Sequence, residues 1–104
     1  MTVLHLQRRI SEWQRQTFGE DKQSITGMWH HLAEELMEAA NGDRAEGEEL
    51  ADVVILAMGL ADRQGLYIEE LVVEKLMKLR KRKWLSPDEN GVVRHVRDED
   101  APPE

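Results

Sequence analysis

Apolar residues recur every three or four positions along the first 84 residues of the chain, which is the spacing of helices that bury one face. In the first such segment, Leu6, Ile10 and Trp13 fall on one side. The aromatic content of 5% and the scarcity of β-branched clusters argue against an all-β fold. The pattern therefore predicts an all-α protein with helices at residues 3–18, 28–40, 44–64 and 68–83.

Polar and conformationally special residues stand where these helices should begin and end. Ser24 or Thr26 is expected to cap the second helix. Asp43, with Glu46 three residues later, has the spacing of a capping box for the third helix. The residues expected to end helices are Asn41-Gly42 for the second, Gly65 for the third and Ser86-Pro87 for the fourth.

The chain is expected to form one helical domain, residues 1–84, followed by a C-terminal tail, residues 85–104. A length of 104 residues suits a single domain. Within the tail, Asn90-Gly91 predicts a turn or a small hairpin, and residues 98–104 are expected to be disordered. A core of this size is small, so an oligomer would help to bury enough apolar surface.

Charge is distributed unevenly along the chain. The formal net charge is −7, from 14 basic and 21 acidic residues. Residues 34–52 hold eight acids and one base, whereas residues 75–83 hold six bases and no acid. Because the overall charge is negative, neither a nucleic acid polymer nor an anionic membrane is the expected partner.

The chain contains no cysteine, which excludes a disulfide scaffold and a thiolate zinc site. It also shows no signal-peptide pattern and no apolar run long enough to span a membrane. These features lead us to expect a cytoplasmic protein.

Three carboxylates share one face of the second predicted helix: Glu34, Glu35 and Glu38. Glu35 and Glu38 lie one turn apart, so their oxygens can reach a single hard cation. Taken alone, a solvated acidic face is the commoner explanation for such a pattern.

The third predicted helix makes a metal site more plausible. Residues 50–61 are apolar on every side except for Asp52. A helix of this kind is expected to be buried, and a buried carboxylate must be paired or bound to a metal. Glu49 lies one turn before Asp52, and a short connection would set the helix antiparallel to the second. Four carboxylates could then converge on Mg²⁺ or Mn²⁺.

The fourth predicted helix carries Lys75, Lys78 and Arg82 within or beside its apolar face. These cations either extend along that face into solvent or bind the phosphates of a substrate. Each of the three tryptophans is more typical of a core or an interface than of a site that stacks a base. Trp29, beside the glutamate face, is the best of them for a base.

The acidic motifs resemble those of the MazG-like, all-α nucleoside triphosphate pyrophosphohydrolase superfamily, which carries Glu-Glu-x-x-Glu on one helix and Glu-x-x-Asp on the next. The resemblance covers residues 3–84, and the segment from Lys75 to Val96 is also similar to the dATP/dGTP pyrophosphohydrolase branch. It implies a four-helix MazG-like protomer that assembles as a homodimer or homotetramer. The matching residues are Glu34-Glu35-Leu36-Met37-Glu38 and Glu49-Leu50-Ala51-Asp52.

The same resemblance implies Mg²⁺-dependent hydrolysis of a nucleoside triphosphate to the monophosphate and pyrophosphate, with Mn²⁺ as an alternative ion. The metal would polarise the α-phosphate and activate the attacking water, and Glu34 would orient or deprotonate that water or act from outside the metal shell. The resemblance implies Glu35, Glu38, Glu49 and Asp52 as metal ligands, Glu34, Glu35 and Glu38 as catalytic residues, and Lys75, Lys78 and Arg82 as phosphate-binding residues.

One position departs from the family pattern: Leu79 stands where the family often has an asparagine that contacts the nucleotide. This departure leaves open a changed substrate specificity or a reduced turnover.

The sequence is also compatible with two functions other than that of an enzyme. One is a catalytically weak, nucleotide-binding regulator. The other is a structural oligomerisation module in which Asp52 pairs with Lys75 or Arg82.

Overall fold

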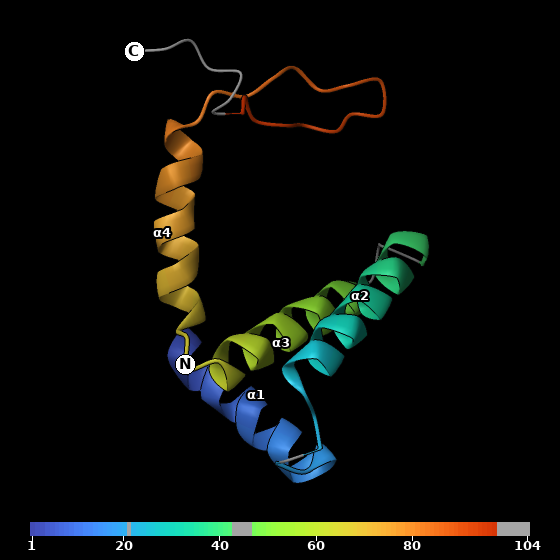
Figure 1. Cartoon of the computed structure of the whole chain (residues 1–104), viewed down its shortest axis with the longest axis vertical. Helices are drawn as coiled ribbons and strands as arrows, with labels where there is room; N and C mark the ends of the chain where they lie inside the picture. The colour runs from blue at the N-terminus through green and yellow to red at the C-terminus, as the bar shows by residue number, and fades with distance from the viewer. Residues whose placement is uncertain (21, 43–46, 98–104) are drawn as a thin grey trace. The chain divides into compact units, whose positions relative to one another are not determined.

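The computed structural model describes residues 1–20, 22–42 and 47–97 (Figure 1). In these ranges the only regular elements are helices, apart from one isolated antiparallel bridge between Trp84 and His95. The predicted all-α fold is thereby confirmed. The chain divides into two compact units, residues 1–71 and a second that begins at Val72. The four helices are α1 (Val3–Phe18), α2 (Ile25–Asn41), α3 (Glu48–Arg63) and α4 (Ile68–Lys81).

Side-chain caps explain where the first two helices begin. The hydroxyl of Thr2 accepts a hydrogen bond from the backbone N–H of His5 at 3.0 Å. Of the two caps predicted for α2, Ser24 is the one used, because its Oγ accepts from the N–H of Gly27 at 2.9 Å. The helix consequently begins three residues earlier than the apolar pattern predicts, with Thr26 inside its first turn.

The other boundaries follow the sequence less closely. The predicted capping box, Asp43 with Glu46, lies outside the described residues, and α3 begins at Glu48. The fourth helix ends at Lys81, two residues before its predicted end.

The first unit is organised around α3, which packs against both α1 and α2. Met28 and Leu32 of α2 meet Leu56 and Leu60 of α3 in the buried core, with Val53 packed against them. These residues recur at helical spacing, so each helix contributes one apolar stripe. The core lies next to the acidic segments and sets the relative position of α2 and α3.

A buried polar stripe attaches α1 to the rest of the unit. Gln7, only 1% exposed, donates from Nε2 to the carbonyl of Leu66 at 2.8 Å. Its Oε1 accepts from the N–H of Ile68 at 2.9 Å. One side chain thus satisfies two backbone groups of the α3–α4 connection. Farther along α1, the buried amide of Gln14 packs against Gly59 of α3, in space that a Cβ would occupy.

The expectation that α3 is buried on every side is wrong for the single chain. Leu50 is 66% exposed and Val54 is 45% exposed, and Asp52 is also exposed. Two neighbouring helices cover only part of the circumference of a third. On α2, Leu36 and Met37 are likewise at least half exposed.

The second unit contains the turn that Asn90-Gly91 predicts. Asp88 organises it, because its Oδ1 accepts from the N–H groups of Asn90 and Val92, both at 2.9 Å. Arg94 closes the loop through an ion pair to Asp88 Oδ2 at 2.6 Å. Residues 98–104, predicted to be disordered, lie outside the described residues. No helix in the described ranges is long and apolar enough to cross a membrane.

Replacing Gln7 with alanine is expected to lower the free energy of unfolding by about 1–3 kcal/mol, because two backbone groups at the α3–α4 connection lose their partner. Chemical denaturation measures this change. Gln16→Ala is the matched control, since Gln16 is exposed on the same helix. Equal losses in the two variants would contradict the role assigned to Gln7.

Candidate functional site

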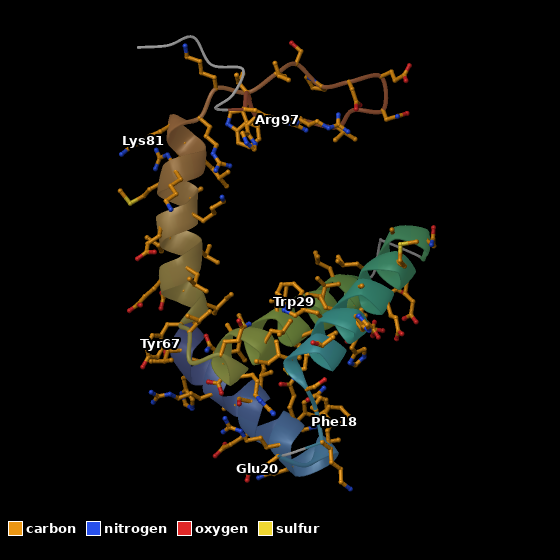
Figure 2. All side chains as sticks on the ribbon, in the orientation of Figure 1. Phe18, Glu20, Trp29, Tyr67, Lys81 and Arg97 are labelled. Atoms are coloured by element: carbon orange, nitrogen blue, oxygen red, sulfur yellow. The ribbon has the colours of Figure 1, made fainter. Side chains whose placement is uncertain are left out.

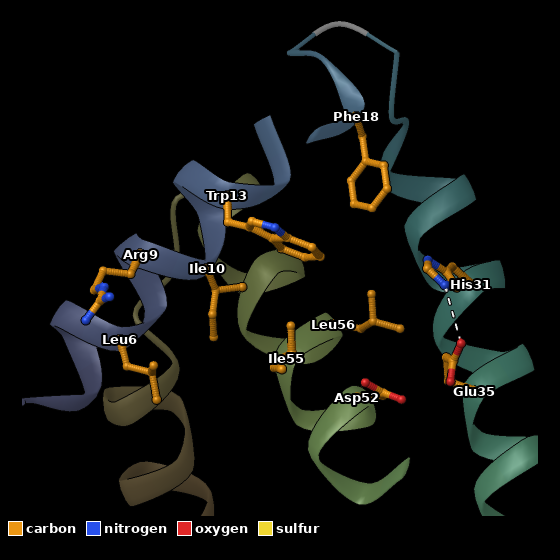
Figure 3. Close-up of a pocket in the computed structure, with 10 residues that line it drawn as sticks. All are labelled: Leu6, Arg9, Ile10, Trp13, Phe18, His31, Glu35, Asp52, Ile55 and Leu56. Carbon is orange, nitrogen blue, oxygen red and sulfur yellow. Dashed lines mark ion pairs between the residues drawn. The ribbon is translucent and has the colours of Figure 1, made fainter. Parts of the chain in front are cut away.

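A pocket of about 610 Å³ opens among α1, α2 and α3 in the first unit (Figure 3). Apolar and aromatic side chains of α1 form one part of it, and acidic side chains of α2 and α3 form another. The pocket therefore brings the predicted motifs next to residues that the motifs do not include. Its lining consists of Leu6, Arg9, Ile10, Trp13, Phe18, His31, Glu35, Asp52, Ile55 and Leu56.

Glu35 and Asp52 face one another across the α2–α3 contact, as Figure 3 shows. The Glu35 side chain is only 19% exposed. Burial raises the pKa of Glu35, and the nearby negative charges of Glu38 and Asp52 raise it further. The two glutamates also share a hydrogen bond that acts in the same direction. Three of the four predicted metal ligands, Glu35, Glu38 and Asp52, are thus close enough to interact electrostatically.

His31, which is not among the residues singled out from the sequence, is a neighbour of Glu35. Its Nε2 lies 3.6 Å from Glu35 Oε1, and the imidazole opposes the rise of the Glu35 pKa. The two residues are four apart on α2, so their side chains lie on the same face. The i, i+4 spacing of this pair is visible in the sequence, although the acidic motifs do not include the histidine.

Glu49 is placed differently from the other three acids. Its carboxylate lies close to Gly42, at the end of α2. Its Oε2 is buried and has no hydrogen-bond partner among the described residues. Within the same ranges, no group of three or more histidine or acidic side chains is close enough together to hold a metal ion. The convergence of four carboxylates on one point is therefore incomplete in the isolated chain.

The acidic residues nevertheless fit a hard divalent cation. A buried carboxylate oxygen without a partner is costly, and a cation removes that cost. Glu35 is crowded by like charges that a cation would offset. All of the donors are oxygens, the ligands that Mg²⁺ and Mn²⁺ prefer.

The aromatic part of the pocket comes from α1. Trp13 and Phe18 meet edge to face, with ring centroids 5.6 Å apart and an interplanar angle of 78°. Both rings remain partly exposed within the pocket, at 52% and 39%. The sequence predicts a core or an interface for Trp13, as it does for the other two tryptophans. Only the position of α2 reveals that this stretch of the face lines a pocket.

Trp29, the base-binding candidate from the sequence, is not among the residues that line the pocket. It is 54% exposed on α2 and is labelled in Figure 2. Glu34 is also exposed and outside the pocket lining. Arg9, which sequence reasoning did not single out, brings a cation to the lining.

The predicted phosphate-binding residues Lys75, Lys78 and Arg82 belong to the second unit. Their role remains a prediction from the sequence. In that unit the carbonyl of Leu79 accepts a hydrogen bond from Trp84 Nε1 at 3.2 Å. The backbone at this position thus helps to fix the indole of Trp84.

Comparison with known proteins adds an independent finding. Residues 6–102 match the dATP/dGTP pyrophosphohydrolase family. A dATP/dGTP diphosphohydrolase of Cyanophage S-2L is 36% identical over 102 residues, which covers 97% of this chain and 94% of the relative. The similarity thus includes both acidic motifs and the basic segment.

A solved structure supports the same relationship. It is the Cyanophage S-2L MazG-like pyrophosphohydrolase, bound to dGDP and three catalytic Mn²⁺ ions per active site. The two chains share 37% sequence identity and superpose with a TM-score of 0.77. The match covers 93% of this chain and 95% of the cyanophage chain.

Replacing Glu35 with glutamine is expected to raise the melting temperature of the metal-free protein at neutral pH. The raised pKa means that the ionised carboxylate destabilises the folded state above its unfolded pKa. The gain should shrink as the pH falls toward about 4, where an unfolded glutamate also becomes protonated. Thermal unfolding in the presence of a chelator, at several pH values, measures it.

Glu34→Gln is the control for this measurement, because Glu34 is the adjacent, exposed acid on α2. A melting temperature for Glu35→Gln that is equal to or below that of the native chain at neutral pH would show that Glu35 is not under electrostatic stress.

Proposed function

The chain belongs to the dATP/dGTP pyrophosphohydrolase family, and on this premise we propose that it hydrolyses dATP and dGTP at the pocket of the first unit. The enzyme class, nucleoside triphosphate pyrophosphohydrolase, follows from the family. The observation that carries the proposal is that one pocket joins Glu35 and Asp52 to the aromatic pair Trp13 and Phe18. A nucleotide has the same two parts, an anionic phosphate chain and a flat base.

The acidic end of the pocket takes the triphosphate through divalent ions. We assign Glu35, Glu38, Glu49 and Asp52 as the ligands of Mg²⁺, with Mn²⁺ able to replace it, and the Mn²⁺ ions of the cyanophage structure support this assignment. Ions held there supply positive charge that stabilises the charge developing on the phosphates. In the net reaction, water adds to the α-phosphorus, the bond to the bridging oxygen breaks, and pyrophosphate leaves.

The chain's own residues have separate tasks in this scheme. His31 orients the carboxylate of Glu35 through their 3.6 Å contact. Glu34, beside the ligands on α2, orients or deprotonates the attacking water. Lys75, Lys78 and Arg82 neutralise the phosphates, a role that rests on the family resemblance.

The aromatic end of the pocket takes the base. Stacking on an indole or a phenyl ring suits a purine because both partners present flat faces. Trp13 therefore replaces Trp29 as the base-binding residue that we favour. Arg9, on the same helix, provides a cation at the edge of this part of the pocket.

The assembly and the setting of the protein are also part of the proposal. A homodimer or homotetramer would cover the exposed apolar residues of α2 and α3, among them Met37 and Leu50. Residues 1–84 would be the catalytic domain, and residues 85–104 its tail. The substrates are cytoplasmic nucleotides, so we place the protein in the cytoplasm, without a nucleic acid polymer or a membrane as partner.

Purified protein should release pyrophosphate from dATP and dGTP only when Mg²⁺ or Mn²⁺ is present, and a chelator should stop the reaction. A panel of all standard ribo- and deoxyribonucleoside triphosphates tests the preference for the base and the sugar. Glu38→Gln should reduce turnover more than the roughly 10–100-fold typical of residues that only support a metal ligand. Glu12→Gln, an exposed change on α1, is the control.

The same assay separates the proposed roles of the glutamates. Glu34→Gln should lower kcat while leaving Mn²⁺ binding unchanged. Metal-dependent nucleotide binding without release of pyrophosphate from any triphosphate would overturn the enzymatic proposal and favour a regulator.

Trp13→Ala should raise KM for dATP and dGTP, because base stacking on an aromatic side chain contributes about 1–3 kcal/mol. This loss corresponds to roughly a 5- to 150-fold higher KM. Trp29→Ala is the matched control and should leave KM near its original value. Steady-state kinetics of both variants measures the difference. A larger increase in KM for Trp29→Ala than for Trp13→Ala would show that Trp29, not Trp13, binds the base.

A further inference from the structure

Gly42 is the residue directly after α2. Its backbone conformation does not require a glycine. Its φ of −93° and ψ of −171° describe extended backbone that any residue adopts. The explanation for a glycine here has to come from its surroundings.

The space beside Gly42 is filled by a carboxylate. A Cβ at this position would lie 2.6 Å from Glu49 Oε2, 2.8 Å from Glu49 Oε1 and 2.9 Å from the carbonyl oxygen of Glu38. All three distances are shorter than van der Waals contact. By contrast, no atom of the described residues lies within 4 Å of such a Cβ at Gly47 or Gly65. A side chain on residue 42 would therefore press on both the Glu49 carboxylate and the backbone carbonyl of Glu38.

The carboxylate of Glu49 is also partly removed from solvent at this place. Its Oε2 is buried and has no hydrogen-bond partner among the described residues. A carboxylate oxygen held in this way is desolvated and ready for a cation.

We propose that Gly42 is a positioning residue for the metal site: its missing side chain lets the carboxylate of Glu49 sit at the end of α2, the helix that carries Glu35 and Glu38. This inference rests on the proposed function, because it takes Glu49 as a metal ligand. The end of the glutamate side chain moves more easily than the backbone carbonyl of Glu38. A methyl group on residue 42 would therefore displace Glu49 and weaken metal binding, even though the acidic motifs are intact.

The test compares Mn²⁺ binding by the native chain, Gly42→Ala, Glu49→Gln and the double variant, by calorimetric titration without nucleotide. Gly42→Ala should weaken binding about tenfold, the lower end of the range for residues that support a metal ligand. In the Glu49→Gln background the same change should have little further effect. A purely structural defect would reduce affinity in both backgrounds.

Gly27→Ala is the matched control. It is the same substitution in the same helix, two turns before Glu35, and should not change Mn²⁺ affinity. Melting temperatures in the presence of a chelator report whether each variant folds. If Gly42→Ala folds poorly, Gly42→Ala/Glu49→Asp should restore part of the stability, because the shorter acid withdraws from the added methyl group while the Glu38 carbonyl stays close to it.

The outcomes distinguish this inference from the proposed function. Weaker binding in Glu49→Gln but unchanged binding in Gly42→Ala overturns the role of Gly42 and leaves Glu49 as a ligand. Unchanged binding in Glu49→Gln removes Glu49 from the ligand set, and the role of Gly42 with it, while pyrophosphate release still decides the activity. Equal losses from Gly42→Ala in both backgrounds, or no restored stability with Glu49→Asp, also overturn the inference.

Discussion

The mutual repulsion of acidic side chains held between α2 and α3 is the constraint on which the rest of this structure depends. Glu35 is largely buried, and burial disfavours its ionised form. The negative charges of Glu38 and Asp52 disfavour that form further. The apolar contacts of the core, such as Leu32 with Leu56, hold the two helices together against this repulsion. A site of this kind trades stability in the metal-free state for strong attraction of a divalent cation.

The buried polar residues of α1 serve the same arrangement from the other side of α3. Gln7 fixes the connection that follows α3, and Gln14 fits against Gly59. With α1 held in this way, its aromatic residues Trp13 and Phe18 line the pocket that also contains Glu35. The metal-binding and base-binding parts of the proposed site thus depend on a single helix, α3, that contacts both neighbours.

Some residues of the candidate site could be predicted from the sequence and others could not, for physical reasons. Glu35 and Asp52, which line the pocket, stand out in the sequence because each has a second acid three positions away, and this spacing is a local property of a helix. The sequence did not indicate that Trp13 rather than Trp29 lines the pocket. Both are exposed tryptophans on helices, and the difference between them is set by which face a neighbouring helix leaves open. Gly42 was identified only as a helix stop, since its closeness to Glu49 depends on how two helices pack.

The sequence by itself determined the fold class, the bounds of α1, the turn at Asn90-Gly91 and the two acidic motifs, because these follow from interactions between residues a few positions apart. Tertiary structure alone decided that α3 packs against both α1 and α2, that its outer face stays exposed at Leu50, and that the Glu49 carboxylate lies beside Gly42 at the end of α2. These features depend on the distances between helices. Such distances are set by the summed packing of many side chains, which no local pattern records.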